Sequence, residues 1–330
     1  MKIKLLAVLA VISVLLIGIA LQRQNDDRVE DLQSRPLLSE QQLEQLAEVE
    51  RIRLSKGDDN VELVLEGGRW GVVARDLFPA QPERIAALLH AVRGARVIEK
   101  QTDNPQYHAR LGLDPEQADA AVETLPLRVQ LGSDEQETAL LFGNPVGSGQ
   151  LVRFADENQV WLINRPFGMT LEPREWLDLK VVRIPMEFAA TARWEHADGE
   201  VLELDKAAEG DYNFRLVGLE QDQQQGNERW TNSMVLALTG LNAQDAALRS
   251  DLELDEPELR MLVTTWQGAE LEASLYDLDG RYWLTIDRFE QPADGNLAVH
   301  ADPRWAFQLG VAQVEDLLKR RTDIIRNESE

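Results

Sequence analysis

The longest uncharged apolar run of the chain stands at its N-terminus. It begins at Leu5 and ends at Leu21, and Lys2 and Lys4 precede it. A helix over this run would be about 25 Å long at 1.5 Å per residue, just enough to span the apolar part of a bilayer. We therefore predict a transmembrane anchor over residues 1–21. The preceding lysines predict a single-pass protein with a cytoplasmic N-terminus and the remaining chain on the other side of the membrane.

A cleaved secretory signal is the alternative interpretation of this run. Gly18 and Ala20 are small enough to stand ahead of a cleavage site. The run continues past that site and is longer than the apolar core of a typical signal, about 7–15 residues, which favours an uncleaved anchor. Both interpretations predict that the bulk of the chain is exported.

Residues 22–48 are predicted to form a polar linker that ends in a short helix. Ser39 and Gln42 have the spacing of a capping box, and Leu43 and Leu46 follow at helical spacing. We expect this segment to separate the anchor from the first folded domain.

The stretch over residues 49–183 has short alternating segments and one amphipathic helix. The predicted strands cover residues 49–54, 61–65, 70–73, 127–131, 138–142, 151–154 and 160–163. Pro82 and Gly94 bracket the helix, in which Ile85, Leu88 and two further apolar residues recur at helical spacing. These elements predict a first α+β domain in which the helix packs on an antiparallel sheet.

The same order of elements recurs in residues 184–325, which predicts a second α+β domain. The predicted strands cover residues 190–194, 201–204, 212–217, 259–266, 271–275 and 282–286, with a helix over 233–241. Residues 326–330 form a polar tail. The predicted fold class is therefore α+β: an N-terminal transmembrane helix followed by two tandem, duplicated domains of antiparallel sheet packed with helices.

The charge balance of the chain excludes some classes of partner. Asp and Glu number 58 against 34 Lys and Arg, which gives a net charge of −24. A chain this acidic repels phosphate backbones, so we expect no nucleic-acid partner, and partners with basic surfaces are favoured. The absence of cysteine removes disulfides, thiolate metal sites and cysteine nucleophiles.

Catalytic and cofactor motifs are missing from the sequence. No two of the four histidines have the spacing of a metal-binding helix. The glycine-rich stretch from Gly143 to Gly149 lacks the lysine of a phosphate-binding loop. Asp277 and Asp279 resemble the start of a calcium loop, but Gly280 and the strand that follows favour a hairpin turn. We therefore assign no catalytic residue, metal ligand or cofactor and expect a protein that is not an enzyme.

The eight tryptophans leave a second function open. Most of them stand in predicted strands, where large aromatic side chains usually fill the core. Trp230 and Trp305 stand in polar or turn-like surroundings and are the candidates for stacking on a sugar. Together with the many carboxylates, they support the alternative of a cell-envelope protein that binds or cleaves glycans.

Several motifs resemble those of an uncharacterised bacterial domain-of-unknown-function family. The motif residues are Trp70, Phe78, Pro79, Gly112, Leu113, Asp114, Pro115 and Gly143. In the Gly-Leu-Asp-Pro element, glycine permits an unusual backbone angle, leucine can enter the core, and Asp-Pro breaks a helix. We expect all eight residues to be structural.

The resemblance implies a function by association rather than by chemistry. Members of the family are membrane-anchored and encoded beside gliding-motility-type ABC transporter components, and the family supplies no catalytic residues. This implies a non-enzymatic periplasmic accessory subunit of an ABC-type transport complex. Its partners would be the permease and ATPase components, bound through protein-protein contacts.

Overall fold

The computed structural model describes residues 34–117, 121–133 and 136–327. The chain divides into two compact units. Unit 1 is made of the residues up to Asn60 together with Ala86–Leu171, and unit 2 is made of Val61–Ile85 together with the residues from Glu172 onward. The predicted boundary between residues 183 and 184 stays a prediction.

The predicted fold class is corrected by the structure. Antiparallel sheet dominates the described residues, and none of the helices among them is long and apolar enough to cross a membrane. The longest, α3 (Pro82–Arg93) and α4 (Glu228–Thr239), have 12 residues each and carry charged side chains. Such helices reach about 18 Å, which is too short for a bilayer. The anchor predicted over residues 1–21 lies outside the described residues.

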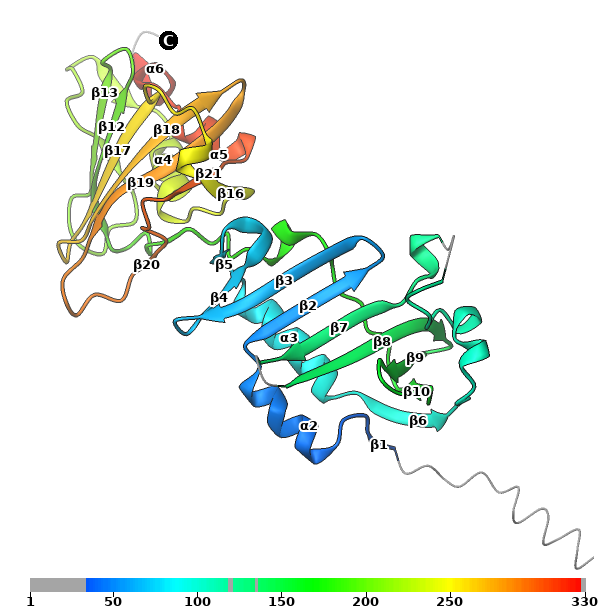
Figure 1. The fold of residues 1–330 in the computed structure, drawn as a ribbon. Coiled ribbons are helices and arrows are strands. Elements are labelled where there is room, and N and C mark those ends of the chain that lie inside the picture. The colour runs from blue at the N-terminus through cyan, green and yellow to red at the C-terminus, as the bar shows by residue number, and fades with distance from the viewer. Residues whose placement is uncertain (1–33, 118–120, 134–135, 328–330) are drawn as a thin grey trace, which may run out of the picture. The chain divides into compact units, whose positions relative to one another are not determined.

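Unit 1 is built on an antiparallel sheet with the strand order β1-β6-β10-β9-β8-β7-β2 (Figure 1). The strands are β1 (Arg35–Pro36), β2 (Arg51–Lys56), β6 (Arg96–Lys100), β7 (Leu127–Gly132), β8 (Glu137–Val146), β9 (Gly149–Phe154) and β10 (Trp161–Ile163). The register places Ile52 opposite Leu131 and Leu54 opposite Val129, and all four are buried. The period of two along each strand therefore directs one face of the sheet into the core.

Two predicted helices are confirmed by their end signals. In α2 (Glu40–Gln45), the Ser39 hydroxyl accepts from the Gln42 backbone N–H and the Gln42 side chain accepts from the Ser39 N–H, so the capping box is present. Helix α3 begins at Pro82 and ends just before Gly94. Short 3-10 turns are η1 (Leu46–Glu48), η2 (Val73–Arg75), η3 (Pro105–Tyr107), η4 (Ala109–Leu111), η5 (Val122–Thr124), η6 (Pro173–Trp176) and η7 (Arg249–Asp251).

Unit 2 contains a large antiparallel sheet with the order β14-β13-β12-β17-β18-β19-β21-β16 (Figure 1). Its strands are β12 (Ala189–His196), β13 (Val201–Asp205), β14 (Arg215–Leu216), β16 (Asp245–Leu248), β17 (Leu259–Thr265), β18 (Glu270–Leu278), β19 (Arg281–Glu290) and β21 (Trp305–Gln308). Trp194, Met261, Ala273 and Ile286 form one buried row across four of these strands. This row marks the core face of the sheet.

The remaining elements of unit 2 are short. Strand β3 (Asp59–Glu66), which enters the unit at Val61, pairs with β4 (Arg69–Val72), and β4 pairs with β5 (Phe78–Pro79). Two further antiparallel pairs join β11 (Val182–Arg183) to β20 (Ala298–Val299) and β15 (Gln223–Gln225) to β22 (Ile325–Asn327). The helices that follow are α5 (Val311–Leu317), which contacts α4, and α6 (Arg321–Ile324).

Two expectations for unit 2 need correction. Helix α4 begins at Glu228 rather than at residue 233, because the Asn227 side chain caps it by accepting the Arg229 backbone N–H. The polar residues of its first turn conceal this start in the sequence. The strand predicted over residues 212–217 is reduced to the two residues of β14.

The two large sheets share a strand order. In unit 1 the order β6-β10-β9-β8-β7-β2 matches β16-β21-β19-β18-β17-β12 in unit 2, strand for strand along the chain. In each case a long helix, α3 or α4, comes between the first strand of the set and the second. A duplication requires the same strand order in both units, and the two sheets have it. That the two halves of the sequence arose by duplication stays a prediction.

Candidate functional site

The Gly-Leu-Asp-Pro motif forms a tight turn in unit 1. Gly112 has a φ of +67°, and a Cβ atom there would lie 2.6 Å from Oδ1 of Asn144. The backbone angle favours glycine, and a larger residue would also displace the Asn144 side chain. A Cβ atom on Gly143 would lie 2.7 Å from Cγ of Leu113, so the second motif glycine makes room for the motif leucine.

Leu113 fills the core beside this turn. It is fully buried and packs in one cluster with four apolar residues of the sheet. These are Leu141 of β8, Leu151 of β9, Leu162 of β10, and Val160 just before β10. The Leu113 side chain thus joins the motif loop to the sheet, as a structural role requires.

A buried arginine holds the backbone of the same loop. Arg153 is 8% exposed, and its Nε donates to the Leu113 carbonyl at 3.1 Å. Its Nη1 donates to the carbonyls of Phe154, Ala155 and Glu157 at 3.0–3.1 Å. Burial lowers the pKa of Arg153, while the nearby Asp114 carboxylate opposes that shift. Guanidinium stays charged in proteins, so the four carbonyls replace its hydration.

The Phe78-Pro79 motif has a corresponding role in unit 2. Phe78 is fully buried, and its ring meets that of Trp305 edge-on at 4.9 Å between centroids. The Pro79 carbonyl accepts the backbone N–H of Asp178 at 2.9 Å. The Trp70 carbonyl accepts the N–H of Ala80 at 2.8 Å. These contacts tie β4 and β5 to distant segments of the same unit.

The structure therefore separates the eight motif residues into two groups. Trp70, Phe78 and Pro79 belong to unit 2, and Gly112, Leu113, Asp114, Pro115 and Gly143 belong to unit 1. Pro115 is exposed behind Asp114, whose side chain accepts the Glu116 backbone N–H at 3.1 Å. The contacts of the motif residues are made within the protein and hold loops in place.

Histidines and carboxylates form no catalytic arrangement in the part of the chain that the structure describes. No group of three or more of these side chains there could hold a metal ion. Nε2 of His108 lies 3.0 Å from the Asn158 carbonyl oxygen, so this nitrogen carries the hydrogen and donates. His196 is buried, which lowers its pKa, and its Nε2 faces the Lys319 carbonyl at 3.2 Å.

The Asp277-Asp279 segment is a hairpin turn, as predicted. Asp279 and Gly280 have φ values of 54° and 79°, and Leu278 pairs with Arg281. Oδ1 of Asp277 accepts the Gly280 N–H at 2.7 Å. This carboxylate therefore holds the turn.

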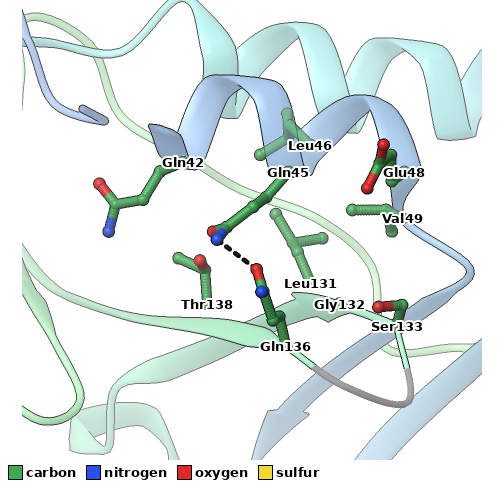
Figure 2. A pocket seen from close by; sticks show the side chains of 10 residues that line it. All are labelled: Gln42, Gln45, Leu46, Glu48, Val49, Leu131, Gly132, Ser133, Gln136 and Thr138. Carbon is green, nitrogen blue, oxygen red and sulfur yellow. Dashed lines mark hydrogen bonds between the residues drawn. The ribbon is translucent and has the colours of Figure 1, made fainter. Parts of the chain in front are cut away.

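A hollow in unit 1 is too small for most ligands. It lies between α2 with η1 and the ends of β7 and β8, and it is lined largely by polar side chains (Figure 2). The amides of Gln45 and Gln136 bond to each other across it. Its volume is about 90 Å³, against roughly 300 Å³ for the smallest usual ligand pockets.

The tryptophans proposed as sugar platforms differ in exposure. Trp305 is only 4% exposed because Phe78 packs against it, so its assignment as a candidate for stacking is wrong. Trp230 is half-buried in α4. Trp266, which the sequence did not single out, is 36% exposed in the turn between β17 and β18.

Unit 2 presents a polar sheet face that the sequence analysis missed. Side chains of β12, β17, β18 and β19 line up in three rows across the face opposite the core. The rows are Thr191-Thr264-Glu270-Glu290, Arg193-Leu262-Glu272-Arg288 and Glu195-Arg260-Ser274-Thr285. We call these twelve residues the polar face, although Leu262 is apolar and the side chains of Ser274 and Thr285 are buried. The polar alternation is visible in β12 and β18, but Leu262 interrupts it in β17 and an extra residue interrupts it in β19. Only the register aligns the rows.

Ion pairs fix most of the charges of the polar face. Arg288 pairs with Glu270 at 2.7 Å and with Glu272 at 2.6 Å. Arg193 pairs with Glu195 at 3.3 Å and with Glu203 of β13 at 2.7 Å. These networks restrain side chains that would otherwise be mobile.

Arg260, in the last of the three rows, is the exception. It stands between Glu195 and Ser274 in the register, it is exposed, and its side chain has no hydrogen bond or ion pair among the described residues. Arg260 is one of the residues that line a hollow of about 290 Å³. This guanidinium is therefore available to an external group.

A β-bulge brings a carboxylate to the same face. The register shifts between Glu272 and Ala273, which leaves Asp287 as an extra residue in β19. Its carboxylate accepts the Ser274 hydroxyl at 2.5 Å and the Thr285 hydroxyl at 2.8 Å. Among the described residues no hydrogen bond joins Ser274 to a histidine, and Asp287 is the acceptor of its hydroxyl hydrogen.

Comparison with known proteins places the chain in a family. The model of a family described as a domain of unknown function, DUF4340, matches residues 70–259. The chain belongs to this family. The match covers more than half of the chain and includes all eight motif residues, and it ends at the first residue of β17. The predicted membership of a domain-of-unknown-function family is confirmed.

No curated protein and no solved structure matches the chain. The DUF4340 match thus supplies the family, and the contacts above supply the roles of its motif residues.

Proposed function

We propose that this protein is a non-enzymatic accessory subunit of an ABC-type transport complex at the periplasmic face of the bacterial inner membrane. It acts through protein-protein contacts with the permease and ATPase components. Membership of the DUF4340 family supports this proposal. The association of such families with gliding-motility-type ABC transporters is by gene neighbourhood, so it indicates a partner rather than a mechanism.

The observation that carries the proposal is the polar face of unit 2. A sheet face holds its side chains at fixed spacings, and the ion pairs of Arg193 and Arg288 restrain two of the long ones. Binding then costs less conformational entropy than it would on a mobile loop. Unpaired Arg260 stands in the last row of this face, and arginine is among the residues enriched in interface hot spots.

The charges of the chain indicate the kind of partner surface. The polar face carries both signs, which favours a partner that matches it in register. The whole chain has a net charge of −24, so it attracts basic regions of a partner over longer distances. We expect the association to weaken as salt rises, because salt screens such attraction.

Affinity purification from the native membrane tests the proposal. The full chain is tagged, extracted in mild detergent, and its companions are identified by mass spectrometry. We expect an ABC permease and ATPase in a constant ratio to the tagged protein. Recovery of the tagged protein without these components would refute the proposal.

A pair of charge-reversal variants tests the surface. Arg260→Glu reverses the unpaired charge of the polar face, and Arg229→Glu makes the same change at an exposed position of α4, outside that face. We expect Arg260→Glu to reduce co-purification at least tenfold and Arg229→Glu to leave it unchanged. Equal recovery with both variants would remove the polar face from the proposal.

A further inference from the structure

A second cavity of unit 2 lies apart from the rows of the polar face. It has a volume of about 320 Å³ and is formed by the turn between β17 and β18, the segment after β19, and Phe188 before β12. This volume is at the lower end of the range for small-molecule sites, about 300–1,000 Å³. We call it the amide pocket, after the side chains that line it.

One wall of the amide pocket is a loop locked by its own side chain. Oε1 of Gln291 accepts the Leu297 backbone N–H at 3.1 Å, and Nε2 donates to the Leu297 carbonyl at 3.5 Å. The Gly295 N–H donates to the Pro292 carbonyl at 2.8 Å. A Cβ atom on Gly295 would lie 2.6 Å from Oε1 of Gln291, so glycine is needed for this closure. The wall is therefore formed before any ligand arrives.

The opposite wall is equally ordered. The Thr265 hydroxyl accepts the Ala269 N–H at 2.8 Å within the hairpin turn. Nε2 of Gln267 donates to Glu209 at 3.2 Å, which turns the Gln267 side chain but leaves its carbonyl oxygen as an acceptor. Trp266, between Thr265 and Gln267 in the sequence, is 36% exposed. Its backbone N–H donates to the Phe188 carbonyl, which ties the turn to the residue before β12.

The lining selects the chemistry of a ligand. Phe188, Ala269 and Leu297 supply apolar surface, while the Asn296 amide and the Asp294 carboxylate have no hydrogen-bond partner among the described residues. No lysine or arginine lines the cavity, so nothing there would neutralise a phosphate or a carboxylate. One carboxylate is too few for calcium, which takes six to eight oxygen ligands.

We infer that the amide pocket binds a neutral sugar residue of a glycan. Sugar hydroxyls both donate and accept, as the amides of Gln267 and Asn296 do. The apolar C–H face of a pyranose ring suits the surface of Phe188 and Leu297. Asp294 adds an acceptor for a hydroxyl. This inference goes beyond the proposed function and does not depend on it.

Ligand-observed saturation-transfer NMR on the full chain tests the inference. The probes are the trimer of N-acetylglucosamine and maltotriose, each at millimolar concentration. We expect saturation transfer to at least one trisaccharide. The double variant Gln267→Ala/Asn296→Ala removes two hydrogen-bonding groups and should weaken binding at least fivefold. Gln106→Ala, an exposed amide of unit 1 without a side-chain partner among the described residues, is the control.

A second variant separates loss of the pocket from loss of its contacts. Gly295→Ala places a methyl group against Gln291 and the Pro292 carbonyl, which should open the loop and abolish binding. Melting temperatures establish that each variant is folded. The inference fails if neither trisaccharide receives saturation transfer, or if both pocket variants bind as the wild type does. Co-purification with transporter components should be unchanged in these variants, so the two proposals fail separately.

Discussion

Truncation of Leu113 tests the structural role of the family motif. Leu113→Ala removes three carbon atoms from a fully buried side chain. The lost transfer free energy is about 2.4 kcal/mol at roughly 0.8 kcal/mol per buried carbon. Its neighbours in the cluster, such as Leu141 and Leu151, are fixed on strands, so the cavity cannot collapse fully and adds a further penalty. We expect a total loss of about 3–4 kcal/mol in the free energy of unfolding.

Urea denaturation, monitored by circular dichroism, measures this loss in the free energy of unfolding. Faster hydrogen exchange of the β8 and β9 amides would assign the loss to unit 1. Leu236→Ala is the matched control, because this leucine is 48% exposed on α4. We expect the control to cost less than about 1 kcal/mol. A loss for Leu113→Ala as small as that of the control would refute the structural interpretation of the motif.

Three further predictions concern buried groups. Phe78→Ala should cost about 3–5 kcal/mol in chemical denaturation, since it removes a buried ring and its contact with Trp305, and a value under about 1 kcal/mol would contradict the packing. Arg153→Met should cost about 3 kcal/mol, because four carbonyls lose their donor, and unchanged stability would show that they find other partners. Burial lowers the pKa of His196 below 6.5, so the unfolded chain binds more protons there and stability should fall as pH drops below 6.5. His196→Gln should flatten the stability profile between pH 5 and 7, and an unchanged slope would assign that dependence to other groups.

Local signals in the sequence predict local elements well. Pro82 and Gly94 delimit α3, and Ser39 with Gln42 caps α2. Asp279-Gly280 forms the predicted hairpin turn. Each of these features depends on residues a few positions apart, so the pattern contains the whole cause.

Long-range contacts explain where the sequence analysis fails. Trp305 looks exposed from its polar neighbours, but Phe78, more than two hundred residues earlier, buries it. The boundaries of unit 2 depend on contacts of this kind, since Val61–Ile85 joins a unit made mostly of later residues. No periodicity within a window reports such a pairing.

The polar face could not be predicted from the sequence either, because it depends on how distant strands pair. The polar alternation of Thr191, Arg193 and Glu195 is visible in the sequence, but it indicates only a half-buried strand. The rows of the polar face require the register of four strands, and the bulge at Asp287 breaks the period of two. Arg260 becomes conspicuous only when its neighbours are known to be paired with other side chains.

Site-specific photo-crosslinking in living cells shows whether the polar face contacts the transporter. A photoreactive residue is placed at position 264 on the polar face or at position 229 on α4 of the full chain. We expect irradiation to give an adduct containing an ABC permease or ATPase from position 264 and none from position 229. Absence of such an adduct from position 264, or the same adduct from both positions, would contradict this expectation.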